Sequence, residues 1–165
     1  MIRRADLTDA QDISNIYNHY ITHTVISFEE TSVSAEEMSS RMNAVFQHRL
    51  PWLVALDNEQ IIGYAYASPW QKRSAYRFSV EVSAYIAPSA KSQCWGSKLF
   101  ETLLAELKDN SVHAVIGGIS LPNPSSVALH EKFGMQKVAH YKEVGFKFDR
   151  WVDVGYWQLI LENEE

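Results

Sequence analysis

The chain has 165 residues, enough for one domain with a sizeable core but not for two ordinary ones. Its 20 acidic and 15 basic residues give a net charge of -5, which argues against nonspecific nucleic-acid binding as the main activity. The one cysteine, Cys94, excludes an intrachain disulfide and fits a reducing, cytoplasmic compartment. We expect a single domain over residues 1–165, with no metal site, no signal peptide and no membrane span.

Helices and strands alternate along the sequence, which favours a mixed α/β domain. Capping-box patterns at Thr8 with Gln11 and at Ser34 with Glu37 open the first two helices. The expected order is a strand at 2–4, the helices after Thr8 and Ser34, strands at 52–56, 60–67 and 77–86, a helix after the loop 91–96, a strand at 112–119, a helix at 127–133, and strands at 136–148 and 151–161.

The strand over residues 77–86 is amphipathic, and its two faces carry different chemistry. Apolar side chains alternate with mainly polar ones, so each set lines one face. One face carries Phe78, Val80, Val82 and Ala84, and the other carries Ser79, Glu81, Ser83 and Tyr85.

The polar loop 91–96 runs directly into a helix with Leu99, Leu103 and Leu107 on its apolar face. A loop that feeds a helix N-terminus offers unpaired N–H groups and the positive end of the helix dipole, an arrangement that binds phosphate. A plain connection between a strand and a helix is the other interpretation of this element.

Residues 122–125 (PNPS) are expected to lie outside regular structure, before the short helix at 127–133, and Gly134 is expected to end that helix. His130 lies on this helix. Taken alone, it fits a surface histidine as well as a functional one.

Together these segments resemble the GCN5-related N-acetyltransferase (GNAT) superfamily. Residues 129–135 (LHEKFGM), preceded by Asn123, are similar to a recurrent ending of that family. Four further stretches resemble its phosphinothricin and methionine sulfone/sulfoximine acetyltransferase branch: 16–20 (IYNHY), 63–70 (GYAYASPW), 120–125 (SLPNPS) and 144–154 (VGFKFDRWVDV). The resemblance covers essentially the whole chain. It implies a mixed, mostly antiparallel sheet flanked by helices and acetyl transfer from acetyl-CoA to a primary amine.

The resemblance also implies where acetyl-CoA binds. Backbone groups of Ala84, Tyr85 and Ile86 are expected to pair with the pantetheine arm as an added strand would. The pyrophosphate is expected at Lys91, Ser92, Gln93, Cys94, Trp95, Gly96 and Ser97. Asn123 is expected to bond the pantetheine region, and Lys132 to reach a phosphate.

Two residues are expected to transfer protons. Glu81 is the candidate general base for the acceptor ammonium, and His130 stands where many members of the family place a tyrosine general acid. Whether His130 acts as base or as acid stays open at this point. An ordinary strand carboxylate and a helix histidine are the alternatives.

The loop 91–96 departs from the family pattern. Lys91 keeps a positive charge but not an arginine fork, Cys94 stands where the family has a glycine, and Trp95 adds bulk. We expect binding through backbone N–H groups to persist; weakened cofactor affinity is the alternative. Cys94 as a nucleophile is the weaker interpretation, because the family transfers the acetyl group directly.

The acceptor is expected to contact residues before the catalytic strand. Arg73 is a candidate for an ion pair with the carboxylate of the acceptor, and Phe28 is expected to form a wall of the acceptor pocket. The other expected acceptor contacts are Ser74, Ala75 and Tyr76. A solvated loop is the alternative.

A homodimer is also expected, with Tyr156 and Trp157 either at its interface or in the core. Other functions considered are acetylation of a protein or another amine, and a non-catalytic acyl-CoA-binding module.

Overall fold

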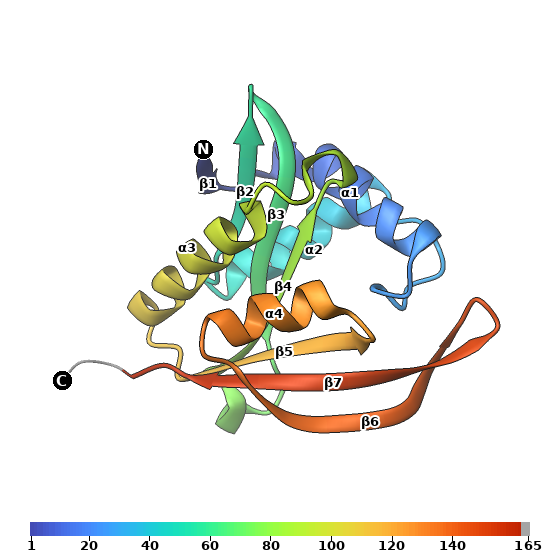
Figure 1. Ribbon diagram of the computed structural model, residues 1–165. Coiled ribbons are helices and arrows are strands. Elements are labelled where there is room, and N and C mark those ends of the chain that lie inside the picture. The colour runs from blue at the N-terminus through green and yellow to red at the C-terminus, as the bar shows by residue number, and fades with distance from the viewer. Residues whose placement is uncertain (163–165) are drawn as a thin grey trace.

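The computed structural model describes residues 1–162 and folds them around one seven-stranded sheet (Figure 1). Residues 163–165, which the expected domain includes, lie outside the described part. The main elements are β1 (Ile2–Arg4), α1 (Ala10–His23), α2 (Ala35–Gln47), β2 (Trp52–Asp57), β3 (Gln60–Pro69), β4 (Ser79–Ile86), α3 (Trp95–Asp109), β5 (Ala114–Leu121), α4 (Pro124–Lys132), β6 (Gln136–Lys147) and β7 (Arg150–Ile160).

The sheet is forked at its centre. Its order is β1-β2-β3-β4-β5-β7-β6, and every pair is antiparallel except β4–β5. The pairing of β4 with β5 covers only three positions, from Ser79–Ala114 to Glu81–Ile116. Beyond them the two strands diverge, and Figure 1 shows β4 rising while β5 runs toward the β6–β7 hairpin. This mixed, mostly antiparallel sheet confirms the expected fold class.

Two hydrophobic cores lie on opposite faces of the sheet. Helices α1 and α2 pack on one face, where Tyr64 of β3 is buried. Helix α3 packs on the other face, where Val80 and Val82 are buried. Figure 1 places α3 and α4 in front of the sheet and α2 behind it. Because side chains alternate along a strand, Glu81 lies on the face of α1 and α2.

Three local expectations need correction. The cap at the start of the chain is Asp6, whose side chain accepts from Thr8 N, because a 3-10 turn (Leu7–Asp9) precedes α1. Helix α4 begins at Pro124, within the segment expected to be irregular, because proline needs no N–H in a first helical turn. Phe78 is 47% exposed and precedes β4, so it does not extend the apolar face.

No helix in the described part of the chain is both long and apolar enough to cross a bilayer. Within residues 1–162, no group of three or more His, Cys, Asp or Glu side chains is placed to hold a metal ion.

Candidate active site

A cleft of about 550 Å³ opens where β4 and β5 diverge. Its floor is formed by Ala84 and Ile86 of β4, and its walls by the loop before α3 and by one side of α4. Ten of the twelve residues expected to bind the cofactor line it: Ala84, Ile86, Lys91, Ser92, Cys94, Trp95, Gly96, Ser97, Asn123 and Lys132. The fork therefore brings together β4, the loop before α3 and α4, which are separate in the sequence.

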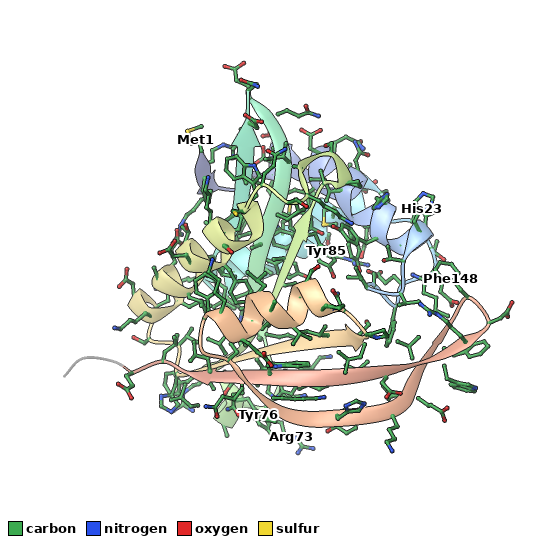
Figure 2. All side chains as sticks on the ribbon, in the orientation of Figure 1. Met1, His23, Arg73, Tyr76, Tyr85 and Phe148 are labelled. Atoms are coloured by element: carbon green, nitrogen blue, oxygen red, sulfur yellow. The ribbon has the colours of Figure 1, made fainter. Side chains whose placement is uncertain are left out.

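Tyr85 and Gln93 do not line this cleft. The Tyr85 side chain points to the opposite face, where its ring meets Tyr17 edge to face at 5.2 Å between centroids. In Figure 2 the Tyr85 label lies on the α1 side of β4. The backbone of Tyr85 still lies on the strand that borders the cleft, and the expectation for Tyr85 concerned backbone groups only.

The N-terminus of α3 meets the cleft without a side-chain cap. Its N-cap residue is Cys94, which has φ 61° and makes no capping hydrogen bond. The orphan N–H groups of the first turn therefore keep their capacity to bind an anion. Lys91 lines the same end of the cleft, and Lys132 donates to Ser97 Oγ at 3.0 Å. Two cations beside an uncapped helix N-terminus suit a diphosphate.

Asn123 caps α4 at the other wall of the cleft. Its Oδ1 accepts from Ser126 N at 3.2 Å, which leaves the side-chain amide nitrogen as a donor beside the cleft. The expected role of Asn123 toward a bound ligand is compatible with its role as the cap at the start of α4.

Glu81 stands at the apex of the fork as the last residue of β4 that pairs with β5. Its Oε1 lies over Gly118, where an added Cβ would come within 3.3 Å of the carboxylate and 3.0 Å of the Tyr156 ring. The carboxylate makes no side-chain hydrogen bond among the described residues, and burial raises its pKa above the usual 4.5. A desolvated carboxylate with free lone pairs is suited to accept a proton.

His130 belongs to α4, and its ring lies between this helix and the other face of the sheet. An added Cβ at Gly117 would come within 2.5 Å of its Nε2, and the ring packs 5.0 Å from that of Phe100. Nδ1 lies 2.7 Å from the Ser126 carbonyl. Because a carbonyl only accepts, Nδ1 carries the proton. Burial lowers the histidine pKa, so the ring is neutral and Nε2 is unprotonated near neutral pH.

The residues expected to contact the acceptor are not gathered in one place. Arg73 and Ser74 line a second hollow, whose other charged residues are Lys72 and Arg77. Ala75 and Tyr76 do not line it. Figure 2 places Arg73 and Tyr76 together at the lower end of the molecule, away from Tyr85.

Phe28 lies elsewhere, in the loop between α1 and α2. Its ring rests on Gly145 of β6, where a Cβ would collide with it. Phe28 therefore bridges this loop and β6, and it is 41% exposed.

A further cavity of about 320 Å³ lies under α2, on the same face as Glu81, and the sequence analysis did not identify it. Trp52, Tyr64 and Tyr66 form one wall, and Arg41 of α2 lines it from the other side. A stripe of aromatic residues on adjacent strands looks like ordinary core in a sequence. The signal that was available is Arg41, a charged residue one turn after the buried Met38 and next to the buried Met42.

A forked sheet, an uncapped helix N-terminus at the fork and a desolvated carboxylate at its apex define the class of N-acyltransferases. Comparison with known proteins gives the family. A family model described as an acetyltransferase (GNAT) domain matches residues 2–155. The chain belongs to the GNAT acetyltransferases.

Several curated relatives are similar over nearly the whole chain. A phosphinothricin N-acetyltransferase of Alcaligenes faecalis is 39% identical over 93% of this chain and 78% of its own length. An L-methionine sulfoximine/L-methionine sulfone acetyltransferase of Salmonella typhimurium is 32% identical over 98% of this chain and 95% of its own. A crystal structure of a phosphinothricin acetyltransferase from Sinorhizobium meliloti, in complex with acetyl-CoA, matches with a TM-score of 0.95 and 36% identity over 98% of this chain and 88% of that one.

Proposed function

We propose that the protein transfers the acetyl group of acetyl-CoA to the α-amino group of a small amino-acid-like acceptor. The observation that carries the proposal is the carboxylate of Glu81, desolvated and without a hydrogen-bond partner among residues 1–162, at the apex of the β4–β5 fork beside which the cofactor cleft opens. The names of the relatives support an acceptor of the phosphinothricin, methionine sulfoximine or methionine sulfone type.

The cleft fits acetyl-CoA. The uncapped N-terminus of α3, Lys91 and Lys132 would hold its phosphates, and the free edge of β4 beyond Glu81 would pair with its pantetheine arm. When bound, acetyl-CoA supplies a thioester that an amine can attack. The net reaction converts an ammonium and a thioester into an amide, a thiol and one released proton.

Glu81 accepts the proton that the acceptor ammonium must lose before the nitrogen can attack. His130 contributes from the opposite face of the fork. Its unprotonated Nε2 can accept the second proton that the amine nitrogen loses as the amide forms and pass it to the departing thiolate. An acid role from the outset would require an imidazolium that burial disfavours. The sequence leaves open whether His130 acts as a base or as an acid, and this placement supports the role of base.

The acceptor's carboxylate pairs with Arg73 in the hollow that also contains Lys72 and Arg77. Support comes from the charge of that hollow, because none of the ion pairs in the described part of the chain uses these three cations. Phe28, which lies in the loop between α1 and α2, forms a wall of the acceptor pocket. Ser74, Ala75 and Tyr76 are expected to shape the same region.

The test is an acetyl-CoA assay that measures release of free thiol with and without a panel of amines. We expect methionine sulfone, methionine sulfoximine or phosphinothricin to stimulate release. Stimulation only by protein N-termini or by other amines would contradict the acceptor class. Acetyl-CoA binding without stimulation by any amine would favour a non-catalytic binding module.

A homodimer, a single domain over residues 1–165 and a reducing, cytoplasmic setting complete the proposal. Trp157 is 2% exposed and belongs to the core, so it does not form an interface, whereas Tyr156 is only partly buried. The β6–β7 hairpin carries a large exposed apolar surface, which marks an interaction site: Val138, Tyr141, Val144, Phe146, Phe148 and Trp151. Light scattering of the Trp151→Glu variant, compared with wild type, tests this interface.

A further inference from the structure

The cavity under α2 contains a hydrogen-bond donor without a partner. Trp52 lines the cavity and is only 2% exposed, and its Nε1–H has no hydrogen-bond acceptor among residues 1–162. Its ring is held by stacking on Tyr66 at 4.0 Å between centroids. Buried donors are almost always paired in native proteins, so an orphan beside a cavity points to an acceptor atom on a ligand.

The cavity lies beside Glu81. Ser68 lines the cavity and is directly opposite Glu81 in the β3–β4 register, on the same face. Tyr66 is the next residue of that face. Burial raises its pKa, and it lies close enough to Glu81, Arg41 and Glu29 for their charges to act on that pKa as well. An amino acid whose nitrogen lies at Glu81 can therefore direct its side chain past Ser68 into the cavity. The volume of about 320 Å³ is at the small end of ligand pockets.

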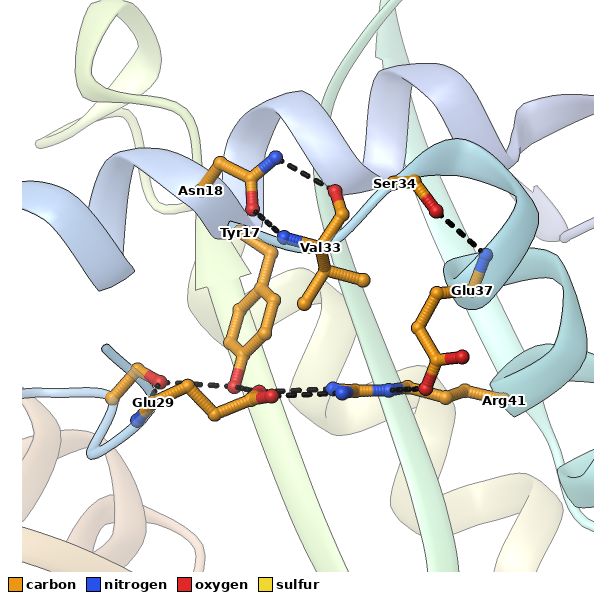
Figure 3. Close-up of polar contacts among 8 residues, drawn as sticks. Tyr17, Asn18, Glu29, Val33, Ser34, Glu37 and Arg41 are labelled. Carbon is orange, nitrogen blue, oxygen red and sulfur yellow. Dashed lines mark hydrogen bonds and ion pairs between the residues drawn. The ribbon is translucent and has the colours of Figure 1, made fainter. Parts of the chain in front are cut away.

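Arg41 would make the cavity cationic if its charge were free, but that charge is neutralised. Its Nη1 and Nη2 donate to the two carboxylate oxygens of Glu29 at 2.9 and 2.7 Å, and its Nε donates to Glu37 at 3.1 Å (Figure 3). The Tyr17 hydroxyl also donates to Glu29. Hydrogen bonds from Arg41 hold the pKa of Glu29 below its usual value, so this carboxylate remains ionised. With Glu37, two carboxylates surround one guanidinium, and the cluster has no spare positive charge for an anionic ligand.

The two hollows of this face therefore differ in charge. They adjoin, since His48 and Pro69 line both. The hollow of Lys72, Arg73 and Arg77 has unpaired cations for a carboxylate. The cavity offers aromatic walls, one orphan N–H and an arginine whose charge two carboxylates already neutralise.

We propose that this cavity receives the acceptor's side chain and selects a tip that is uncharged but carries hydrogen-bond-accepting oxygens, with the Trp52 N–H as donor. The inference rests on the proposed function. It predicts that methionine sulfone, whose tip is a neutral sulfone, is preferred over phosphinothricin, whose tip is an anionic phosphinate, and over methionine, whose thioether accepts hydrogen bonds only weakly.

The experiment compares kcat/KM for these three acceptors in wild type and in two variants. We expect wild type to favour methionine sulfone by about tenfold or more over each of the others. A factor of this size corresponds to the loss of one hydrogen bond or to one uncompensated charge. Trp52→Phe removes the donor and should lower the sulfone-to-methionine ratio by about tenfold. Glu29→Gln removes one of the two carboxylates that surround Arg41 and leaves Glu37 as its counter-ion. The cavity then repels an anionic tip less, and the phosphinothricin-to-sulfone ratio should rise by a similar factor.

The matched control is Glu36→Gln, which makes the same charge change on an exposed part of α2 and should leave both ratios unchanged. The KM for acetyl-CoA and the thermal midpoint of each variant report whether the fold is intact. A wild type that prefers phosphinothricin, or ratios that neither variant moves, would overturn the inference while leaving the proposed function standing. Thiol release that none of the three acceptors stimulates would overturn both.

Discussion

Glu81 and His130 approach neighbouring residues of one strand from opposite faces of the sheet. The carboxylate of Glu81 lies over Gly118 and the ring of His130 lies over Gly117. Both glycines directly follow Ile116, the last residue of β5 that pairs with β4. The absence of a Cβ at these two positions lets both groups reach the fork. Their environments differ, because Glu81 lies on the face of α1 and α2, whereas the His130 ring is buried between α4 and β5.

Replacing Glu81 by glutamine should lower kcat by about 10²-fold or more, because the amide cannot accept the ammonium proton. The KM for acetyl-CoA should stay unchanged, since Glu81 does not line the cofactor cleft. Steady-state kinetics over a pH series checks this. In wild type, kcat/KM should rise with pH as Glu81 loses its proton, at a pKa raised above 4.5 by burial, and this limb should be missing in the variant. Equal losses in kcat and in cofactor affinity would refute the role.

Replacing His130 by phenylalanine should keep the contact with Phe100 but remove Nε2. We expect kcat to fall by about 10²-fold, as for the loss of a proton-transfer group, with the thermal midpoint close to that of wild type. Stopped-flow or steady-state rates together with thermal unfolding measure both quantities. A variant with an unchanged kcat would make His130 a packing residue only.

Replacing Cys94 by glycine should stabilise the protein by about 1 kcal/mol. Cys94 has φ 61°, a conformation that costs a side chain with a Cβ about that much and glycine nothing. Chemical denaturation of the two proteins gives the difference in the free energy of unfolding. The acetyl-CoA dissociation constant should not change, because binding uses backbone N–H groups. A tighter dissociation constant in the variant would mean that the cysteine side chain weakens cofactor binding.

Lys147 of β6 holds the loop between α1 and α2, and replacing it by methionine should release that loop. The side chain is 2% exposed, and its Nζ donates to the carbonyls of Ile21 and Ser27, both at 2.7 Å. Loss of these charge-assisted bonds should cost about 2 kcal/mol of stability. Because Ser27 Oγ contacts the Tyr17 hydroxyl at the acceptor cavity, the KM for the acceptor should rise while that for acetyl-CoA does not.

Lys142→Met is the matched control for that variant, since Lys142 lies on the same strand but is exposed. It should behave as wild type in denaturation and in kinetics. If Lys147→Met raises both KM values equally, the loop does not act on the acceptor alone.

The sequence predicts the parts of this site that depend on local periodicity. Alternation along the strand places Glu81 on the face opposite Val80 and Val82, as the structure confirms. Capping at Ser34 is also confirmed, by the bond from Glu37 N at 3.1 Å.

Features that depend on contacts between distant segments could not be predicted in this way. No local sequence pattern predicts that the His130 ring lies over Gly117. Nor does one predict that Arg41 pairs with Glu29, which lies twelve residues earlier and across a loop. The first cap was missed because the 3-10 turn after Asp6 moves the start of α1 to Ala10.

The sheet also acts as a partition between two halves that can vary independently. Trp52, which we propose selects the acceptor, lies on the side of α1 and α2, and Lys132, which we propose holds a phosphate, lies on the other side. Free-energy effects of substitutions at well-separated sites without shared partners add. The acceptor half can therefore be redesigned, or can drift in evolution, while one unchanged cofactor half serves every version.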